Sequence, residues 1–254
     1  MLKFKVVLVL FFLSVLVVFI GFESHASLLW LILGLVLIWI TIIFLASMSM
    51  SWQFFIEAIT HKKQSKKPYF AITFDDGPNP TYTPIVLDIL KKHNAKATFF
   101  LIGKEAEKFP ELVKQIISDG HTLGNHSYSH AVNSGFFSKK NWLVEFTRTN
   151  NIIKNLGHEV EFFRPPFGVT TPNLAKAIKQ TQLKIIGWNK RSFDTFFKNE
   201  TNILNRVAKN LKPGDIILLH DKQANCVPVL ERLLQIANQN QLQAVTINTL
   251  LHEN

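Results

Sequence analysis

The chain has 254 residues, a formal net charge of +10 and one cysteine, which excludes an intrachain disulfide bond. Residues 1–60 hold two lysines and two acidic residues, so the whole net charge belongs to residues 61–254. A basic domain attracts anionic partners such as lipid headgroups, lipid pyrophosphates or acidic glycans. The basic residues are spread widely and show no nucleic-acid-binding motif, so we expect no nucleic-acid partner.

The chain begins with two long apolar segments, at about residues 6–22 and 26–50. Each is near the roughly 20 residues that a membrane helix needs, and neither has a polar face. We therefore predict a membrane anchor over residues 1–60 with two transmembrane helices. Cleavage of a signal peptide after Ala26 is the alternative, because Ser24 and Ala26 form a small-x-small pattern. The first apolar segment is, however, long for a signal peptide.

Lysines flank these two segments on their outer sides. Two precede the first segment and four follow the second, within residues 61–67, whereas the loop between the segments has neither Lys nor Arg. The positive-inside rule then places both ends in the cytoplasm. We expect a multi-pass protein of the plasma (inner) membrane whose second domain, residues 68–254, follows a basic linker at 61–67. The lysine distribution favours the cytoplasmic side for this domain.

Adjacent carboxylates at Asp75 and Asp76 are the most informative feature of the chain. Residues 69–74 read as a buried strand, and Gly77 with Pro78 then breaks the chain into a loop. Two neighbouring carboxylates at a strand end are costly to bury unless a cation shares them. This position therefore favours a metal site.

Two histidines supply the remaining ligands of such a site. His126 and His130 are four residues apart, a spacing that one helical turn would bring onto one face. One carboxylate with two imidazoles leaves open positions on a divalent metal, and the second carboxylate stays free to accept a proton from water. A helix surface without metal is the alternative explanation of this spacing.

Apolar, strand-like runs alternate with amphipathic segments over the rest of the chain. This alternation predicts an α/β fold with a parallel sheet, and the candidate site residues follow strands. Strands are expected at 97–101, 184–188, 215–219 and 243–246, and helices through Leu112 and Ile116, around 203–207, and from Val229 to Ala237.

From about Pro68 onward the chain resembles the NodB-homology domain of polysaccharide deacetylases, the family-four carbohydrate esterases. Five elements carry this resemblance in order, at residues 73–78, 126–130, 164–168, 188–194 and 218–220. The resemblance implies a distorted, incomplete (β/α) barrel preceded by the two transmembrane helices.

The resemblance also implies roles for individual residues. Asp75 is then the general base, and Arg164 pairs with it and keeps it ionised. Asp76, His126 and His130 hold a divalent metal, usually Zn²⁺, although Co²⁺ and Mn²⁺ suit the same ligands.

Three further residues complete the implied machinery. His220 is the general acid, Asp194 orients and charges it, and the Phe167 backbone N–H helps to stabilise the oxyanion. The chain departs from the family at Arg191 and Thr195, where Asp and Trp are common. We expect these departures to affect substrate fit and local charge rather than catalysis.

We therefore predict a metal-dependent deacetylase that hydrolyses the amide of an N-acetylated sugar in a polysaccharide or cell-wall glycan. O-deacetylation of a polysaccharide uses the same machinery. A deformylase or deacetylase of a polyprenyl-phosphate-linked sugar is the runner-up, since a hairpin anchor suits such a substrate. A catalytically silent, membrane-bound scaffold that binds glycan or metal is the alternative from a different class.

Overall fold

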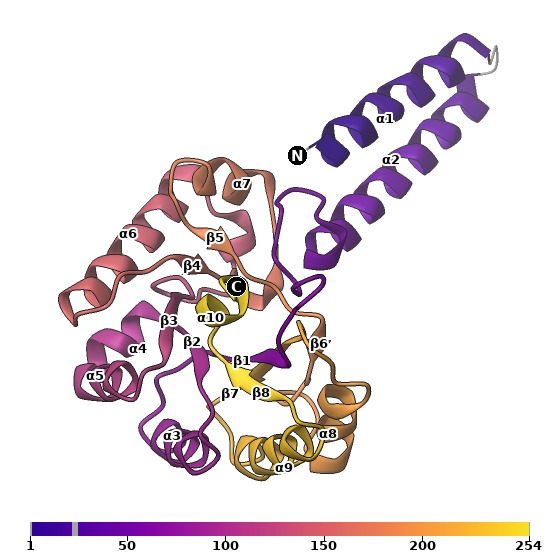
Figure 1. The fold of residues 1–254 in the computed structure, drawn as a ribbon. Helices are drawn as coiled ribbons and strands as arrows, with labels where there is room; N and C mark the ends of the chain where they lie inside the picture. The colour runs from indigo at the N-terminus through magenta and orange to yellow at the C-terminus, as the bar shows by residue number, and fades with distance from the viewer. Residues whose placement is uncertain (1, 22–24, 254) are drawn as a thin grey trace.

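The computed structural model describes residues 2–21 and 25–253. Its first two helices, α1 (Leu2–Gly21) and α2 (His25–Ser47), project side by side from an α/β domain (Figure 1). By length and composition, Lys3–Ile20 and Leu28–Ser47 are apolar enough to cross a membrane, and neither window is buried within the described chain. Residues 22–24, which include the expected end of the first span and Ser24 of the small-x-small pattern, lie outside the described residues.

The second helix ends at Ser47, three residues before the expected limit of its apolar span. Met50 begins a short 3₁₀ helix, η1 (Met50–Trp52), and its side chain is buried. Phe54 and Phe55 follow and are also buried. The chain therefore turns from α2 directly into the domain.

Residues 50–61, which we call the strap, pack along the open side of the sheet. The Ile59 N–H donates to the carbonyl of Ile185, and the Gly187 N–H donates to the carbonyl of Ile59. His61 forms an isolated antiparallel bridge with Asp215. The strap thus bonds through its backbone both to Ile185 and Gly187 and to Asp215, and so spans the opening in the sheet between these residues.

The sheet is parallel throughout its described pairings, as the alternation of strands and helices predicts. It curls into a half-barrel, as the family resemblance implies. Its strand order is β5-β4-β3-β2-β1-β7-β6, with β8 paired to β1. The strands are β1 (Tyr69–Asp75), β2 (Ala97–Leu101), β3 (Thr122–Asn125), β4 (Phe162–Phe163), β5 (Lys184–Ile185), β6 (Lys190–Arg191), β7 (Ile216–His220) and β8 (Gln243–Val245).

Helices surround this sheet (Figure 1). They are α3 (Thr83–Lys92), α4 (Gly103–Lys108), α5 (Pro110–Ser118), α6 (Lys139–Asn155), α7 (Pro172–Ile178), α8 (Glu200–Ala208), α9 (Cys226–Gln239) and α10 (Ile247–Leu251), with 3₁₀ turns η2 (Ser134–Phe136) and η3 (Pro166–Gly168). The predicted helices correspond to α5, α8 and α9. The long α6 was not predicted, because its sequence is polar on average and buries only four side chains.

The central strand β1 fixes the position of the site. Residues 70–75 are all buried, and the Phe74 ring stacks on Phe99 of the neighbouring strand at 5.1 Å. In register, Asp75 lies opposite Phe100 on one side and His220 on the other. Parallel pairing therefore brings the chemical groups that follow these strands to one edge of the sheet.

Candidate active site and metal centre

Asp75 and Arg164 form a fully buried ion pair at the end of β1. Arg164 Nη1 donates to Asp75 Oδ1 and to the Thr73 hydroxyl, each at 2.7 Å. The other guanidinium donors are also used, since Nε and Nη2 donate to the carbonyls of Ile186 and Gly187. Burial lowers the pKa of Arg164, and the charge of Asp75 opposes this shift. The Asp75 carboxylate is thereby oriented, with Oδ2 directed towards His126 at 3.7 Å.

Asp76, His126 and His130 come together beside this pair, and their ligand atoms lie within 4.8 Å of one another. The Nε2 atoms of His126 and His130 are 3.5 and 3.2 Å from Asp76 Oδ1. That oxygen is buried and accepts no hydrogen bond within the described chain. The structure therefore presents two imidazole nitrogens and one carboxylate oxygen around a common point.

The protonation of this cluster suits metal binding. His126 Nδ1 donates to the carbonyl of Arg164 at 2.8 Å, which leaves the lone pair on Nε2. Burial, together with the charge of His126, lowers the pKa of His130 to about 4. Burial alone would raise the pKa of Asp76, but the imidazoles of His126 and His130 beside it hold this pKa well below its usual value. Neutral imidazoles and an ionised carboxylate are what a divalent cation requires.

The two histidines lie in a loop after β3, so the helical turn predicted from their spacing is wrong. His126 directly follows the strand, and Ser127 and His130 both adopt positive φ angles, of 66° and 47°. Asp76 (φ 73°) and Phe167 (φ 59°) do the same. Such backbone is uncommon for residues other than glycine and persists where the surrounding contacts impose it.

Glu145 of α6 supplies those contacts for the histidine loop. Its carboxylate accepts hydrogen bonds from the backbone N–H groups of Tyr128 and Ser129 at 2.9 and 2.8 Å, and from the Ser129 hydroxyl. The Asn125 side chain accepts from the Ser127 N–H at 2.7 Å. These contacts hold both imidazoles in place without a helix.

His220 and Asp194 form the second acid–base pair of the site. His220 Nδ1 donates to Asp194 Oδ1 at 2.7 Å, and the His220 backbone N–H donates to Oδ2 at 2.8 Å. Asp194 is buried and also accepts from the Ser192 hydroxyl. Burial alone would lower the pKa of His220, but the hydrogen bond and charge of Asp194 raise it above its ordinary value. His220 thus lies at the sheet edge next to Asp75.

Phe167 lies over the metal-ligand cluster. Its ring is 4.6 Å from the ring of His130 and its side chain is 43% exposed. Within the described chain its backbone N–H has no hydrogen-bond acceptor, whereas the N–H of Gly168 donates to Pro165. A free N–H donor therefore stands beside the cluster.

Arg191 and Thr195, the two departures from the family pattern, lie on the other side of the site. The Arg191 guanidinium stacks over the rings of Trp188 and Phe193, at 5.4 and 4.4 Å. Thr195 is exposed, and its N–H donates to Asp194 Oδ1. Neither residue disturbs the bond between Asp194 and His220.

Two residues of the site were missed from the sequence. Thr73 accepts from Arg164 and donates to the carbonyl of Ile217 at 2.6 Å. Its position two residues before Asp75, on the same face of the strand, was a usable signal. Lys222 Nζ donates to Asp76 Oδ2 at 3.1 Å, and no sequence pattern marked it.

An apolar pocket of about 390 Å³ separates α2 from the site. Its walls include Trp39 and Phe44 of α2, Phe167, and the loop residues Val132 and Phe136, whose side chains are each 91% exposed. The loop that carries His130 therefore continues into an exposed apolar segment beside the apolar helix.

Known proteins share this arrangement. A family model described as polysaccharide deacetylase matches residues 62–186. One peptidoglycan-N-acetylglucosamine deacetylase of Bacillus cereus is 41% identical over 155 residues, which cover 61% of this chain and 56% of that protein. A second protein of the same name and organism is 36% identical over 200 residues, which cover 76% of this chain and 92% of that protein.

A solved structure agrees with these sequence matches. The crystal structure of a peptidoglycan N-acetylglucosamine deacetylase in complex with 4-naphthalen-1-yl-N-oxidanyl-benzamide superposes with a TM-score of 0.71 at 34% identity. The superposition covers 75% of this chain and 91% of that chain. The half-barrel, the ordered sequence elements and these matches together show that the chain belongs to the polysaccharide deacetylase family, whose named members here are hydrolases of carbon–nitrogen bonds.

Proposed function

We propose that the protein is a metal-dependent deacetylase that hydrolyses the acetamido group of an N-acetylated sugar in a cell-wall glycan. The observation that carries this proposal is the close grouping of a paired carboxylate, a three-ligand cluster and a paired imidazole at one sheet edge. The matched relatives are named as deacetylases of N-acetylglucosamine in peptidoglycan, which supports that sugar as the substrate class.

Asp76, His126 and His130 would hold the metal. The close grouping of the three ligand atoms and the unpartnered Asp76 Oδ1 support this assignment, and several divalent ions, with Zn²⁺ first among them, suit the donor set. When bound there, such an ion lowers the pKa of water and polarises a carbonyl oxygen.

Asp75 acts as the general base in this proposal. Its Oδ1 is held by Arg164, so Oδ2 stays available on the side of the metal ligands to accept a proton from the attacking water. The free N–H of Phe167 donates to the oxygen that becomes negative as the amide carbonyl is attacked.

His220 acts as the general acid. The amine leaves only after it gains a proton, and a protonated imidazole next to Asp75 would supply one. Asp194 keeps Nδ1 protonated, so Nε2 carries the proton that is transferred. After transfer, the neutral imidazole is ready to be reprotonated for the next turnover.

The division of the chain is also part of the proposal. Residues 1–60 would anchor the protein in the plasma (inner) membrane through α1 and α2, and residues 61–67 would link the anchor to the catalytic domain at 68–254. The length and apolar composition of the two helices support the anchor. The strap, with Phe54 and Phe55 in the core, would then fix the domain rigidly against the membrane.

A polyprenyl-phosphate-linked sugar is a second candidate substrate. The apolar pocket between α2 and Phe167 supports it, because an isoprenoid chain leaving the bilayer along α2 would meet the site there. A glycan polymer would not need this apolar wall.

Acetate release tests the proposal. The full chain in detergent, loaded with Zn²⁺, is incubated with N-acetylglucosamine oligomers or purified peptidoglycan, and Asp75→Asn is assayed beside it. We expect release by the wild type and a loss of about 10²-fold or more in the variant, with metal content unchanged. Equal activity of both proteins, or none in the wild type with any of these glycans or with lipid-linked N-acetylglucosamine, would contradict it.

A further inference from the structure

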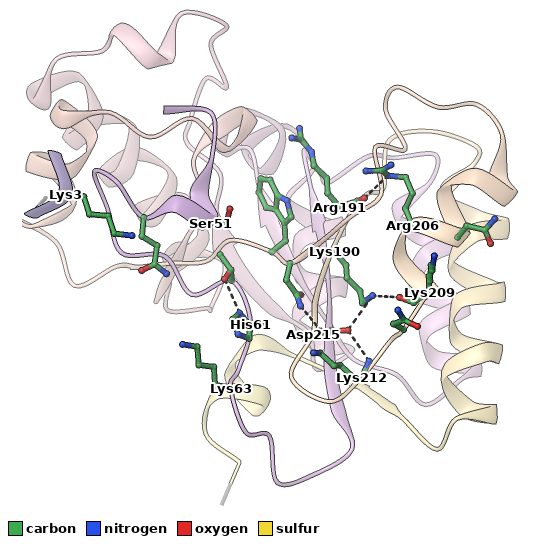
Figure 2. Close-up of a pocket in the computed structure, with 16 residues that line it drawn as sticks. Lys3, Ser51, His61, Lys63, Lys190, Arg191, Arg206, Lys209, Lys212 and Asp215 are labelled. Atoms are coloured by element: carbon green, nitrogen blue, oxygen red, sulfur yellow. Dashed lines mark hydrogen bonds and ion pairs between the residues drawn. The ribbon is translucent and has the colours of Figure 1, made fainter. Parts of the chain in front are cut away.

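A cavity of about 1180 Å³ opens between the strap, the edge strand β6 and helix α8 (Figure 2). Seven cationic side chains line it, and we call it the basic pocket: Lys3, Lys63, Lys190, Arg191, Arg206, Lys209 and Lys212. Asp215 is its only carboxylate among the described residues. The pocket is separate from the metal-ligand cluster, none of whose members lines it.

The one carboxylate that lines the basic pocket among the described residues does not neutralise its positive charge. Asp215 pairs with Lys190 at 3.7 Å and already accepts from the Asn189 side chain and the Lys212 backbone N–H. The other six cationic side chains form no ion pair with any described carboxylate. Like charges gathered around one cavity repel one another, and an anion with several oxygens would offset that repulsion.

The donors in the basic pocket suit phosphate. Arginine offers planar paired donors for phosphate oxygens, and lysine contributes point charges. Figure 2 shows Arg191 and Arg206 on one side of the cavity and Lys3 and Lys63 on the other, so a ligand there is approached from opposite walls. The Arg206 guanidinium is held by its bond to the carbonyl of Arg191 and by stacking on Phe193.

The position of the basic pocket indicates where its ligand comes from. Lys3 lies in the first turn of α1, and its Nζ donates to the carbonyl of Trp52 at 2.7 Å. Ser51 and Gln53 of the pocket wall follow within six residues of Ser47, where the second apolar window ends. The mouth of the pocket is therefore level with the domain-side ends of both apolar helices. Figure 1 shows β6 on the side of the domain from which these helices project.

Two exposed aromatic residues adjoin the basic pocket, since Trp52 lies between its lining residues Ser51 and Gln53, and Phe196 lines a neighbouring pocket with Arg191 and Arg206. Trp52 is 50% exposed and Phe196, in the loop after β6, is 79% exposed. Apolar rings beside lysine and arginine are typical of surfaces that lie in the headgroup region of a bilayer. If the ligand were a soluble phosphate compound, it would not explain why these aromatic rings are exposed beside the pocket.

We propose that the basic pocket binds the phosphate headgroups of anionic membrane lipids and so holds the catalytic domain against the bilayer. This inference rests on the proposed membrane anchor, and it is independent of the deacetylation chemistry. The charges retain a lipid headgroup, and the exposed rings enter the adjacent apolar layer.

Lipid binding by the full chain tests the inference. The purified protein in dodecyl maltoside micelles is titrated with phosphatidylglycerol or phosphatidylcholine carrying the same fluorophore, and a Kd is obtained from anisotropy. We expect a clear preference for phosphatidylglycerol. Lys209→Gln with Lys212→Gln should weaken this binding by about tenfold or more, because each lysine near an anionic surface adds to the attraction.

Lys91→Gln with Lys114→Gln is the matched control. These lysines lie on α3 and α5, outside the basic pocket, and removing them changes the net charge equally. Equal affinity for the two lipids, or an equal effect of both double variants, would overturn the proposal. Tight binding of inorganic pyrophosphate without any lipid preference would overturn the lipid source. Acetate release is measured on the same samples. It shows whether the proposed deacetylase activity is present, independently of the outcome for lipid binding.

Discussion

At the scale of single residues, the site is organised by two pairs, each of which joins a buried carboxylate to a basic side chain. Arg164 directs its guanidinium donors to Asp75, Thr73 and two backbone carbonyls, which is the complete pairing that a buried cation needs. Asp194 does the same for His220 through two hydrogen bonds. Asp75 and His220 lie opposite each other in the register of β1 and β7, so the two pairs are neighbours in the site.

The dependence of activity on pH tests the second pair. A general acid must be protonated, so kcat/KM falls as the pH rises through its pKa. Because Asp194 raises the pKa of His220, the wild-type fall should lie above the ordinary histidine value of about 6.5. Asp194→Asn removes the charge, so the fall should move to lower pH and kcat should drop. The pH profiles of the two proteins check this.

If Asp194 only supported the structure, the loss of its charge would leave the pH profile of kcat/KM unchanged. Ser192→Ala removes another hydrogen bond to Asp194 while keeping its charge, and it serves as the control. It should lower stability without moving the alkaline fall. An unchanged profile in Asp194→Asn would show that His220 is not the acid.

At the scale of elements, the histidine loop depends on α6, which is distant from it in sequence. Glu145 accepts from two loop N–H groups and one hydroxyl, and these are charge-assisted bonds. Glu145→Gln keeps the size but removes the charge. We expect a loss of about 1–3 kcal/mol in the free energy of unfolding and weaker Zn²⁺ affinity, about 10–100-fold. Thermal unfolding and a chelator competition measure the two effects.

Glu111 provides the comparison. It forms an exposed pair with Lys114 on α5, and such pairs contribute little to stability. Glu111→Gln should therefore change neither measurement. Normal Zn²⁺ affinity in Glu145→Gln would mean that the loop is held by its own sequence.

The strap gives a second prediction at this scale. Phe54, Phe55 and Ile59 belong to the segment that a truncated protein beginning at residue 68 would lack, and both phenylalanines are buried. Losing a buried phenylalanine typically costs about 3–5 kcal/mol. Residues 48–254 should unfold at a higher temperature than residues 68–254 and should express better. Equal Tm values would show that the strap is only a linker.

Parallel strands and the elements that follow them could be predicted from the sequence. The buried runs that became β1, β2 and β7 are continuous and apolar, and the ionisable residues after β1 and β7 mark the site. The histidine loop could not be predicted correctly, since its spacing fits a helix and its shape is imposed by Glu145 and Asn125. The strands β4 and β6 were not predicted, and β5 was predicted as the longer strand 184–188. Each has only two residues, which is too few to show an alternation of apolar and polar side chains.

At the scale of the whole molecule, helices α1 and α2, the strap and the candidate site follow one another in space. The carbonyl of Ser47 at the end of α2 accepts from the Thr170 N–H, three residues after Phe167. The apolar pocket and the basic pocket both open beside the domain-side end of α2. This arrangement agrees with the proposal that α1 and α2 anchor the domain at a membrane.

Removal and return of the metal is the measurement that tests the central claim most directly. The full chain is stripped with a chelator, and acetate release from N-acetylglucosamine oligomers, peptidoglycan or lipid-linked N-acetylglucosamine is followed as Zn²⁺ is added back. We expect activity to vanish and to return in full at one equivalent of metal, whereas Asp76→Ala should neither bind the metal nor recover. Acetate release that persists in the stripped protein would contradict the account.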